Sequence, residues 1–177
     1  MHPTVRIATV DDAAATARAH VEAWKVAYEG IVPASHLDAL DIEERTKEWT
    51  SILRGEVEVP AVARPTNHVV EVDGLVVGFA CVGDYREDNQ PEHGELWALY
   101  VHPDQWGTGC GAALMRTTLR QFADERRRTG HLWVLQHNTT AQGFYEGWGW
   151  RHDPDTEPHR FDIDGVPNAE IPYRIDL

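Results

Sequence analysis

Apolar residues in this chain follow two spacings, one typical of strands and one typical of helices. Two β-prone runs, His68–Val72 and Leu75–Val82, flank Asp73-Gly74, a pair that favours a two-residue hairpin turn. Similar runs follow at Glu95–Val101 and His131–His137. The pattern therefore predicts an antiparallel pair followed by two further strands, with a short first strand over Val5–Ala8.

Helical spacing fills most of the intervals between these runs. Asp11 or Asp12 can cap an Ala-rich segment that continues to Tyr28, and Gly30 and Pro33 end it. Further helices are expected over Ala34–Leu40, Ile42–Leu53, Gly107–Arg128 and Thr139–Trp148. The stretch from 55 to 66, with Pro60 and Pro65, is expected to be a connector.

The order of these elements indicates the fold class. Antiparallel strands come first, strand–helix–strand crossovers follow, and one or two strands around Asp164-Gly165 end the chain. We expect an α/β (α+β) fold: a mixed, mostly antiparallel central sheet with helices on both faces. The two strands joined by the helix after Gly107 should be parallel. A single domain over residues 1–177 fits this length.

Composition excludes several classes of protein. Hydrophobic residues make up 42% of the chain, which argues against disorder, and no apolar run is long enough to span a membrane. The first residues lack a signal-peptide pattern, and two cysteines give no disulfide framework. We expect a cytoplasmic protein without a membrane partner.

The net charge of the chain further limits the kinds of partner that it can bind. The formal net charge of −13 disfavours nucleic acid as a partner and suits a cationic substrate. The histidines show no H-x₃-H or H-E-x-x-H spacing, so no metal site is predicted.

The most informative segment follows the strand that ends at Val101. A polar loop leads into alternating glycines, Gly107, Gly109 and Gly111, and then into a helical pattern. Glycines allow close approach of the backbone to a ligand, and a helix N-terminus attracts anions, so this segment predicts a phosphate or pyrophosphate site. Ala112-Ala113 stands where a P-loop needs Lys and Ser or Thr.

Two interpretations of this loop remain. Gly107–Ala112 satisfies the dinucleotide-binding pattern G-x-G-x-x-G/A, but the strand His131–His137 ends without the carboxylate that would bind a ribose. The other interpretation is an acyl-coenzyme A loop, since Trp106–Gly111 resembles the Q/R-x-x-G-x-G/A loop of the GNAT N-acetyltransferase superfamily. Trp106 departs from that pattern. A second GNAT-like motif, N-x-x-A-x-x-F-Y-x-x-x-G-F, is matched by Asn138–Trp150.

This resemblance covers Val69 to Trp150 and implies a site for acetyl-coenzyme A. It implies that the strands before and after the loop helix splay apart, with the pantetheine arm bonded to the backbone of Leu99 and Val101. The residues expected to bind the cofactor are Leu99, Tyr100, Val101, Trp106, Gly107, Thr108, Gly109, Cys110, Gly111, Ala112 and Asn138. Cys110 is interpreted as a small buried residue, and Asn138 suits helix capping equally well. Arg116 and Arg120 either contact phosphate or form a solvated helix face.

Two catalytic residues are candidates. Glu95 lies eleven residues before Trp106, the spacing of the catalytic glutamate in many GNAT relatives, and would act as general base. Asp84, Glu22 and Glu29 are alternatives. Tyr145 matches the Tyr of the second motif, whose hydroxyl points at the coenzyme A sulfur in relatives, and would act as general acid.

Aromatic residues near the N-terminus resemble one wall of the family's acceptor pocket. We expect Trp24, Tyr28 and His93 to contact the substrate. Packing in the core is the alternative for Trp24 and the expected role of Trp49. The resemblance thus implies direct acetyl transfer, through a ternary complex, to a primary amine of a small, cationic acceptor. An acyl-coenzyme A sensor or partner module is the alternative, and a dinucleotide-dependent oxidoreductase is disfavoured. Homodimers are frequent in the family, but nothing in the sequence locates an interface.

Overall fold

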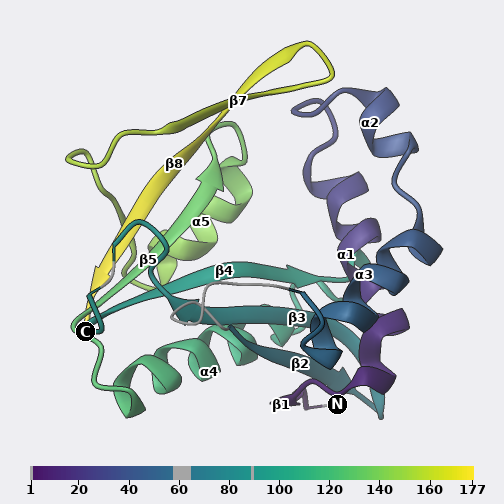
Figure 1. Cartoon of the computed structure of the whole chain (residues 1–177), viewed down its shortest axis with the longest axis horizontal. Helices are drawn as coiled ribbons and strands as arrows, with labels where there is room; N and C mark the ends of the chain where they lie inside the picture. Colours follow the sequence, from purple (N-terminus) through teal and green to yellow (C-terminus); the bar gives the residue numbers. More distant parts are fainter. Residues whose placement is uncertain (1, 58–64, 89) are drawn as a thin grey trace.

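The computed structural model describes residues 2–57, 65–88 and 90–177. One eight-stranded sheet runs through the molecule in the order β1-β2-β3-β4-β5-β8-β6, and β7 pairs with β8 outside this path (Figure 1). The strands are β1 (Thr4–Ile7), β2 (Thr66–Val72), β3 (Leu75–Asp84), β4 (His93–Val101), β5 (Thr129–Leu135), β6 (Arg151–His152), β7 (His159–Ile163) and β8 (Val166–Asp176). Among the described strands, only β4 and β5 pair in parallel, so the sheet is mixed and mostly antiparallel, as predicted.

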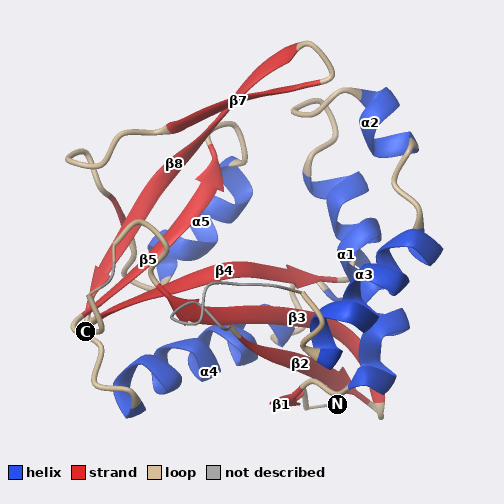
Figure 2. Cartoon of the chain, in the orientation of Figure 1, coloured by secondary structure: helices blue, strands red, loops and turns tan. Residues whose placement is uncertain are grey.

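Helices cover both faces of this sheet (Figure 2). They are α1 (Ala13–Ala27), α2 (Ala34–Asp38), α3 (Ile42–Arg54), α4 (Cys110–Asp124) and α5 (Thr139–Gly147). One core lies between the sheet and the pair α1 and α3, where Trp49 is buried against Phe79 as the sequence predicted. A larger core lies on the other face, under α4 and α5.

Two hairpins close where the sequence placed them. Asp73 and Gly74 take φ angles of 51° and 79° between β2 and β3, and Asp164 and Gly165 take 50° and 83° between β7 and β8. Both central residues of each turn are left-handed, the geometry of type I′ turns, which matches the twist of the joined strands.

Several boundaries differ from the sequence prediction, most of them by one or two residues. Helix α4 begins at Cys110 rather than Gly107, because Gly107 and Gly109 have φ angles of 76° and 95° that no α-helix accommodates. It ends at Asp124, before Arg126 turns left-handed with a φ of 59°. Strand β5 begins two residues early, because backbone pairing with β4 and β8 starts at Thr129. Most of the predicted connector, residues 58–64, lies outside the described residues.

Strands β4 and β5 are hydrogen-bonded to each other at one end of the pair and separate at the other. The two strands pair only from His93 to Leu96 of β4, and then diverge (Figure 1). Gly94 and Gly130 face each other across the pair, and a Cβ on either would lie within 3 Å of the Phe122 ring of α4. Because these two positions lack side chains, α4 packs directly against the paired end of β4 and β5. No helix in the described part of the chain has the length and apolarity needed to cross a bilayer.

Candidate active site

The loop between β4 and α4 is shaped by two left-handed glycines. A Cβ built on Gly107 or Gly109 would meet no atom within 4 Å, so the loop faces open space at both positions. Neither backbone N–H donates a hydrogen bond to a described residue. The N–H groups of the first turn of α4 point the same way as the helix axis and also lack intrahelical acceptors. This backbone geometry forms a cradle that suits an anion, and binding of a phosphate here stays a prediction.

Trp106 fixes this loop to the end of β4. Its indole N–H donates a 2.7 Å hydrogen bond to the carbonyl of Val101, while the ring remains 44% exposed. Cys110 is fully buried at the start of α4, with its sulfur 3.4 Å from the Thr108 hydroxyl, which confirms its interpretation as a small buried residue. The side chain at the position where relatives carry Gln or Arg thus anchors the loop.

Beyond Leu96, β4 keeps a partner on one side only. Leu99 and Val101 pair with Ala80 and Gly78 of β3, whereas β5 no longer pairs with this part of β4. The edge of β4 that faces the divergence is therefore available to another extended chain. This geometry agrees with the expected role of the backbone of Leu99 and Val101.

Tyr145 lies in the second turn of α5, just past the end of β5. Burial, and then the neighbouring Tyr100 hydroxyl, raise the pKa of Tyr145 well above the ordinary value for a phenol. Tyr100 packs on the α1 side of the sheet and Tyr145 on the α4 and α5 side. Their interaction therefore runs through the divergence of β4 and β5. No hydrogen bond joins the Tyr145 hydroxyl to another described residue, and its role toward a ligand stays a prediction.

Asn138 caps α5. Its side-chain oxygen accepts a 3.1 Å hydrogen bond from the N–H of Ala141, and the residue is buried. The capping alternative is thus confirmed, and contact of Asn138 with a cofactor stays a prediction.

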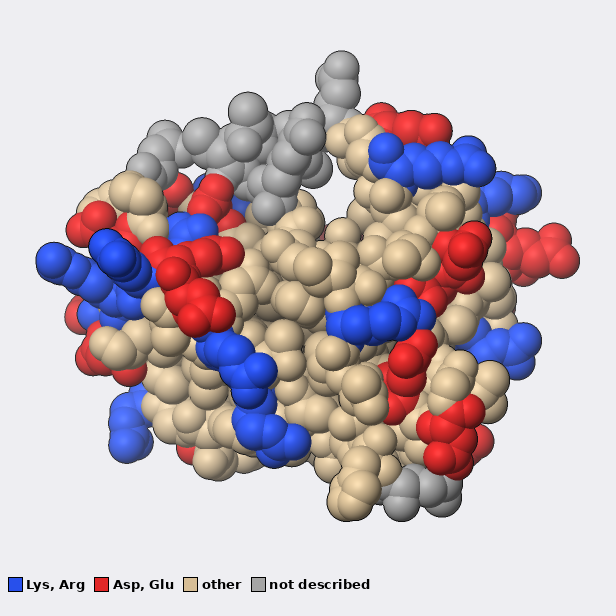
Figure 3. All heavy atoms as spheres, turned by 90° about the horizontal axis from the view of Figure 1, so that it is seen from below, with Lys and Arg blue, Asp and Glu red and all other residues tan. Residues whose placement is uncertain are grey.

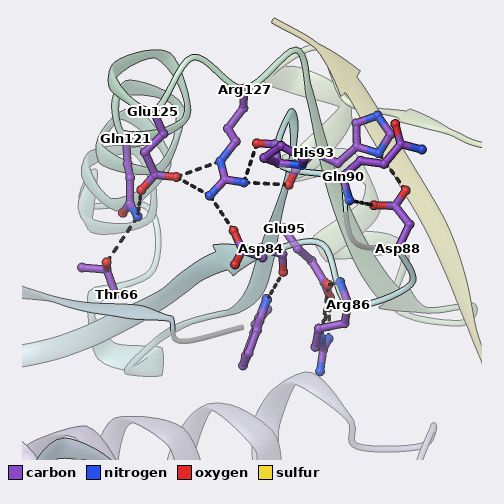
Figure 4. A network of polar contacts seen from close by, with 12 residues as sticks. Thr66, Asp84, Arg86, Asp88, Gln90, His93, Glu95, Gln121, Glu125 and Arg127 are labelled. Carbon is purple, nitrogen blue, oxygen red and sulfur yellow. Dashed lines mark hydrogen bonds and ion pairs between the residues drawn. The ribbon is translucent and has the colours of Figure 1, made fainter. Parts of the chain in front are cut away.

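Glu95 is fully buried near the start of β4, on the α1 side of the sheet. Arg86, in the loop after β3, surrounds its carboxylate: the backbone N–H donates at 2.9 Å, the side-chain Nε lies 3.0 and 3.1 Å from the two oxygens, and Nη2 completes the pair. Figure 4 shows the two side chains pointing at one another. Arg86 also lies over the Trp97 ring, at 4.7 Å. The candidate base is therefore already held in an ion pair.

The alternative base Asp84 is also paired. Arg127, which follows α4, donates a 2.7 Å hydrogen bond to Asp84 and another, at 2.8 Å, to Glu125 (Figure 4). His93 lies nearby with a ring nitrogen 2.8 Å from Asp88. Glu22 is half-buried on α1 and Glu29 is exposed after it. The structure does not bring His93 together with the aromatic residues of α1 that were expected to share its role.

An aromatic cluster joins α1 to the end of β4. The hydroxyls of Tyr28 and Tyr100 lie 2.9 Å apart, Trp24 packs edge-on against Tyr28 at 4.7 Å, and His20 stacks on Tyr100 at 4.9 Å. Burial raises the pKa of both Tyr28 and Tyr100. Trp24 and Tyr28 thus stand beside the diverging part of β4.

The family model "Acetyltransferase (GNAT) family" matches residues 18–150. The chain belongs to this acetyltransferase family. The match spans α1 to the end of the second sequence motif, which confirms the resemblance found in the sequence.

Similar proteins agree with this membership. An uncharacterized N-acetyltransferase of Bacillus subtilis (strain 168), YuaI, is 28% identical over 95% of this chain and 90% of its own length. The L-amino acid N-acyltransferase MnaT of Escherichia coli (strain K12) is 39% identical over 35% of this chain and 34% of its own length.

Solved structures show the same fold. The PaiA N-acetyltransferase of Thermoplasma acidophilum, in complex with coenzyme A, matches with a TM-score of 0.75 at 16% identity, and the match covers all of both chains. YncA of Salmonella typhimurium, with acetyl-CoA, matches with a TM-score of 0.70 at 19% identity over 100% of this chain and 95% of that one. The splayed pair β4 and β5 is thus part of a fold shared with GNAT acetyltransferases.

GNAT acetyltransferases take the acetyl group from acetyl-coenzyme A, and the loop of this chain fits such a group. Gly107 and Gly109 leave the volume around the cradle open, and unpaired N–H groups face it. Arg116 and Arg120 are exposed on α4. Figure 3 shows basic side chains interspersed with acidic ones on the underside of the molecule, where α4 lies. This face shows no continuous basic patch, so the loop is the stronger candidate for the anion site on it.

Sequence reasoning missed two residues that shape this site. Arg86 captures Glu95, and Glu170 of β8 reaches the same side of the sheet. Arg86 lies in a polar loop without a motif, and Glu170 lies in a tail strand outside the region of resemblance. Only the pairing of β8 with β5 would have shown where Glu170 lies.

Proposed function

We propose that this acetyltransferase moves the acetyl group of acetyl-coenzyme A directly to a primary amine of a small, cationic acceptor, within a ternary complex. The observation that carries the proposal is the open glycine cradle set beside the one-sided edge of β4, with the free Tyr145 hydroxyl across the divergence. Acetyl-coenzyme A supplies an activated thioester when bound.

The chain's own residues would hold and orient this co-substrate. The N–H groups of the loop, from Gly107 to Ala112, would bind the diphosphate, and the backbone of Leu99 and Val101 would bond the pantetheine arm. Trp106 and Tyr100 would support these segments. Bringing both reactants together in this way contributes several kcal/mol, on the order of 7, to lowering the barrier.

Tyr145 would donate a proton to the departing sulfur. A phenol is protonated at neutral pH, so it can give its proton to the thiolate that forms as the carbon–sulfur bond breaks. The raised pKa of Tyr145 keeps the hydroxyl protonated at neutral pH, which is the state that an acid needs.

The base role of Glu95 stays a prediction. Its carboxylate would have to exchange a proton while Arg86 holds it, directly or through water. The Glu95→Gln variant tests this role through the pH profile of kcat/KM: loss of the acid limb supports Glu95 as base, and an unchanged limb contradicts it.

The acceptor is proposed from charge and from relatives. The net charge of −13 favours a cation. The name of the relative MnaT adds L-amino acids to the acceptors worth testing. Trp24, Tyr28 and His93 are proposed to contact the acceptor. We also propose a cytoplasmic enzyme that does not bind nucleic acid and needs no metal, and a homodimer is an arrangement to test by light scattering.

The deciding experiment is coenzyme A thiol release from acetyl-coenzyme A in the presence of polyamines, aminoglycosides, amino acids and short peptides. Amine-dependent release supports the proposal and identifies the acceptor class. Binding of acetyl-coenzyme A without release by any amine would instead favour a sensor or partner-binding module on the same fold. Binding of NAD in place of coenzyme A would favour an oxidoreductase.

A further inference from the structure

Carboxylates around the β4–β5 pair differ in whether they are already paired. Glu95 is held by Arg86, and Asp84 is held by Arg127. Glu170 is half-buried and makes no hydrogen bond or ion pair with any described residue. Its cross-strand neighbour His159 lies 3.6 Å from Glu87. The protein offsets the desolvation of this carboxylate only in part, so a cationic ligand would stabilise its charge further.

Strand pairing fixes where Glu170 lies. It stands directly opposite Leu135, the last residue of β5, and opposite His159 of β7. Residues opposite each other in an antiparallel pair share one face of the sheet. Leu135 packs against Tyr28, Val32 and Leu37 on the segment from α1 to α2. Glu170 therefore lies on the face that looks toward α1, at the end of β5. Figure 1 shows β4 diverging from this end of β5.

Charged and titratable groups from several elements surround Glu170. They are His159 of β7, Arg86 of the loop after β3, Glu95 and Tyr100 of β4, and Tyr28 of α1. Burial raises the pKa of Glu170, Glu95 raises it further, and His159 and Arg86 oppose the rise. The charge of Glu170 in turn raises the pKa of Tyr28 and Tyr100. This carboxylate is thus close to the hydroxyl pair that adjoins Tyr145.

An aromatic stack lies next to this carboxylate. The rings of Trp133 and His159 stack 3.7 Å apart at an angle of 17°, on the same face as Glu170. A carboxylate beside aromatic faces suits an alkyl ammonium, because the charge binds the carboxylate and the methylene groups pack on the rings.

We propose that Glu170 binds the ammonium group of the acceptor and accepts its proton. This inference rests on the proposed function and assigns its base and its acceptor anchor. Glu170 removes one proton from the ammonium and passes it to solvent. The neutral nitrogen then bonds to the thioester carbon. As the carbon–sulfur bond breaks, Tyr145 gives its proton to sulfur and takes the second proton that the nitrogen releases. In this assignment Glu170, not Glu95, is the base, and Glu95 positions Arg86. An acid limb that is lost in Glu95→Gln but kept in Glu170→Gln would contradict it.

The test uses the full chain with the amine that gives the strongest thiol release. Glu170→Gln keeps the shape of the side chain and removes its charge. We expect kcat/KM for the amine to fall about 100-fold. The acid limb of its pH profile should disappear, while the affinity for coenzyme A, measured by calorimetry, stays within about twofold of the wild-type value. Glu170→Asp should restore part of the activity and shift the limb.

Asp176→Asn is the matched control. Asp176 lies on the same face of β8, six residues further on, paired with Arg174 and far from the divergence. The Asp176→Asn substitution removes the same charge from the same strand, and the kinetic constants of this variant should equal those of the wild type. An equal loss of kcat/KM in this variant would mean that the effect of Glu170→Gln comes from net charge alone, and this would overturn the proposal.

Failure of each idea gives a different result. Wild-type protein that releases no thiol with any amine overturns the proposed function, and the role of Glu170 with it. A wild-type enzyme whose Glu170→Gln variant retains the acid limb, or retains activity within threefold, overturns the role of Glu170 alone. If Glu170→Gln does not bind coenzyme A, Glu170→Asp decides, and an unmoved acid limb in that variant is the contrary result.

Discussion

At the scale of single residues, the Tyr145 hydroxyl is the group whose removal is most informative. Tyr145→Phe should lower kcat by about tenfold or more, because the departing sulfur loses its proton donor. Affinity for acetyl-coenzyme A should stay near the wild-type value, since the ring and its packing against Phe144 and Trp150 remain. Steady-state kinetics and calorimetry measure the two quantities.

Tyr173→Phe provides the comparison for this variant. Tyr173 is also a buried tyrosine, and its hydroxyl donates a 2.9 Å hydrogen bond to Glu146 on the far side of α5. Its loss should cost stability, about 1 kcal/mol, and leave kcat unchanged. Equal turnover in Tyr145→Phe and the wild type would remove Tyr145 from the chemistry.

A second residue-scale prediction concerns His131. This ring stacks on Tyr85 at 3.9 Å, and burial, followed by the neighbouring His93, lowers its pKa to about 4. Between the ordinary value of 6.5 and about 4, the unfolded chain binds a proton at this residue and the folded chain does not. The free energy of unfolding should therefore fall as pH drops through this window, by about 1.4 kcal/mol per pH unit at most.

Urea unfolding at several pH values between 7 and 4 measures this dependence. His131→Asn removes the titrating ring and should flatten the slope relative to the wild type. A slope that is the same in both proteins would show that other groups cause the acid sensitivity.

At the scale of elements, the start of α4 depends on the left-handed Gly109. Gly109→Ala should lower the affinity for coenzyme A about tenfold and destabilise the fold by about 1 kcal/mol, because a Cβ is strained at a φ of 95°. Calorimetry and thermal unfolding provide the two measurements.

Gly143→Ala is the control for this substitution. Gly143 is exposed inside α5, and a Cβ there would meet no atom within 4 Å. This variant should raise stability by about 0.5 to 1 kcal/mol through helix propensity, with unchanged binding. A loss of affinity in both variants would disprove the role of the Gly109 backbone.

Elements also show how far sequence reasoning reaches. The hairpin at Asp73-Gly74 and the cap at Asn138 are local, so a few letters predict them. The register of β5 and the capture of Glu95 by Arg86 depend on segments distant in sequence, and no local pattern encodes them. Glu170 was missed for the same reason: only the pairing of β8 with β5 brings it to the site.

At the scale of the whole molecule, the net charge of −13 acts as a field around the enzyme. If the acceptor is cationic, kcat/KM for it should fall as ionic strength rises, because salt screens the attraction that increases the rate of encounter. Steady-state assays at a series of sodium chloride concentrations measure how kcat/KM depends on ionic strength. The value of kcat serves as the internal control, and it should change little; a kcat/KM independent of salt would contradict a cationic acceptor.

The sheet order has a consequence for how the chain folds. Strands β5 and β6 are joined in the sheet only through β8, which is synthesised after both. Until β8 leaves the ribosome, one edge of β5 has no partner, and unpaired edges of this kind promote aggregation. Long-range pairing of β8 is also slow compared with hairpin formation. The pairing of β8, the strand that carries Glu170, is therefore the folding step before which the nascent protein is most prone to aggregate.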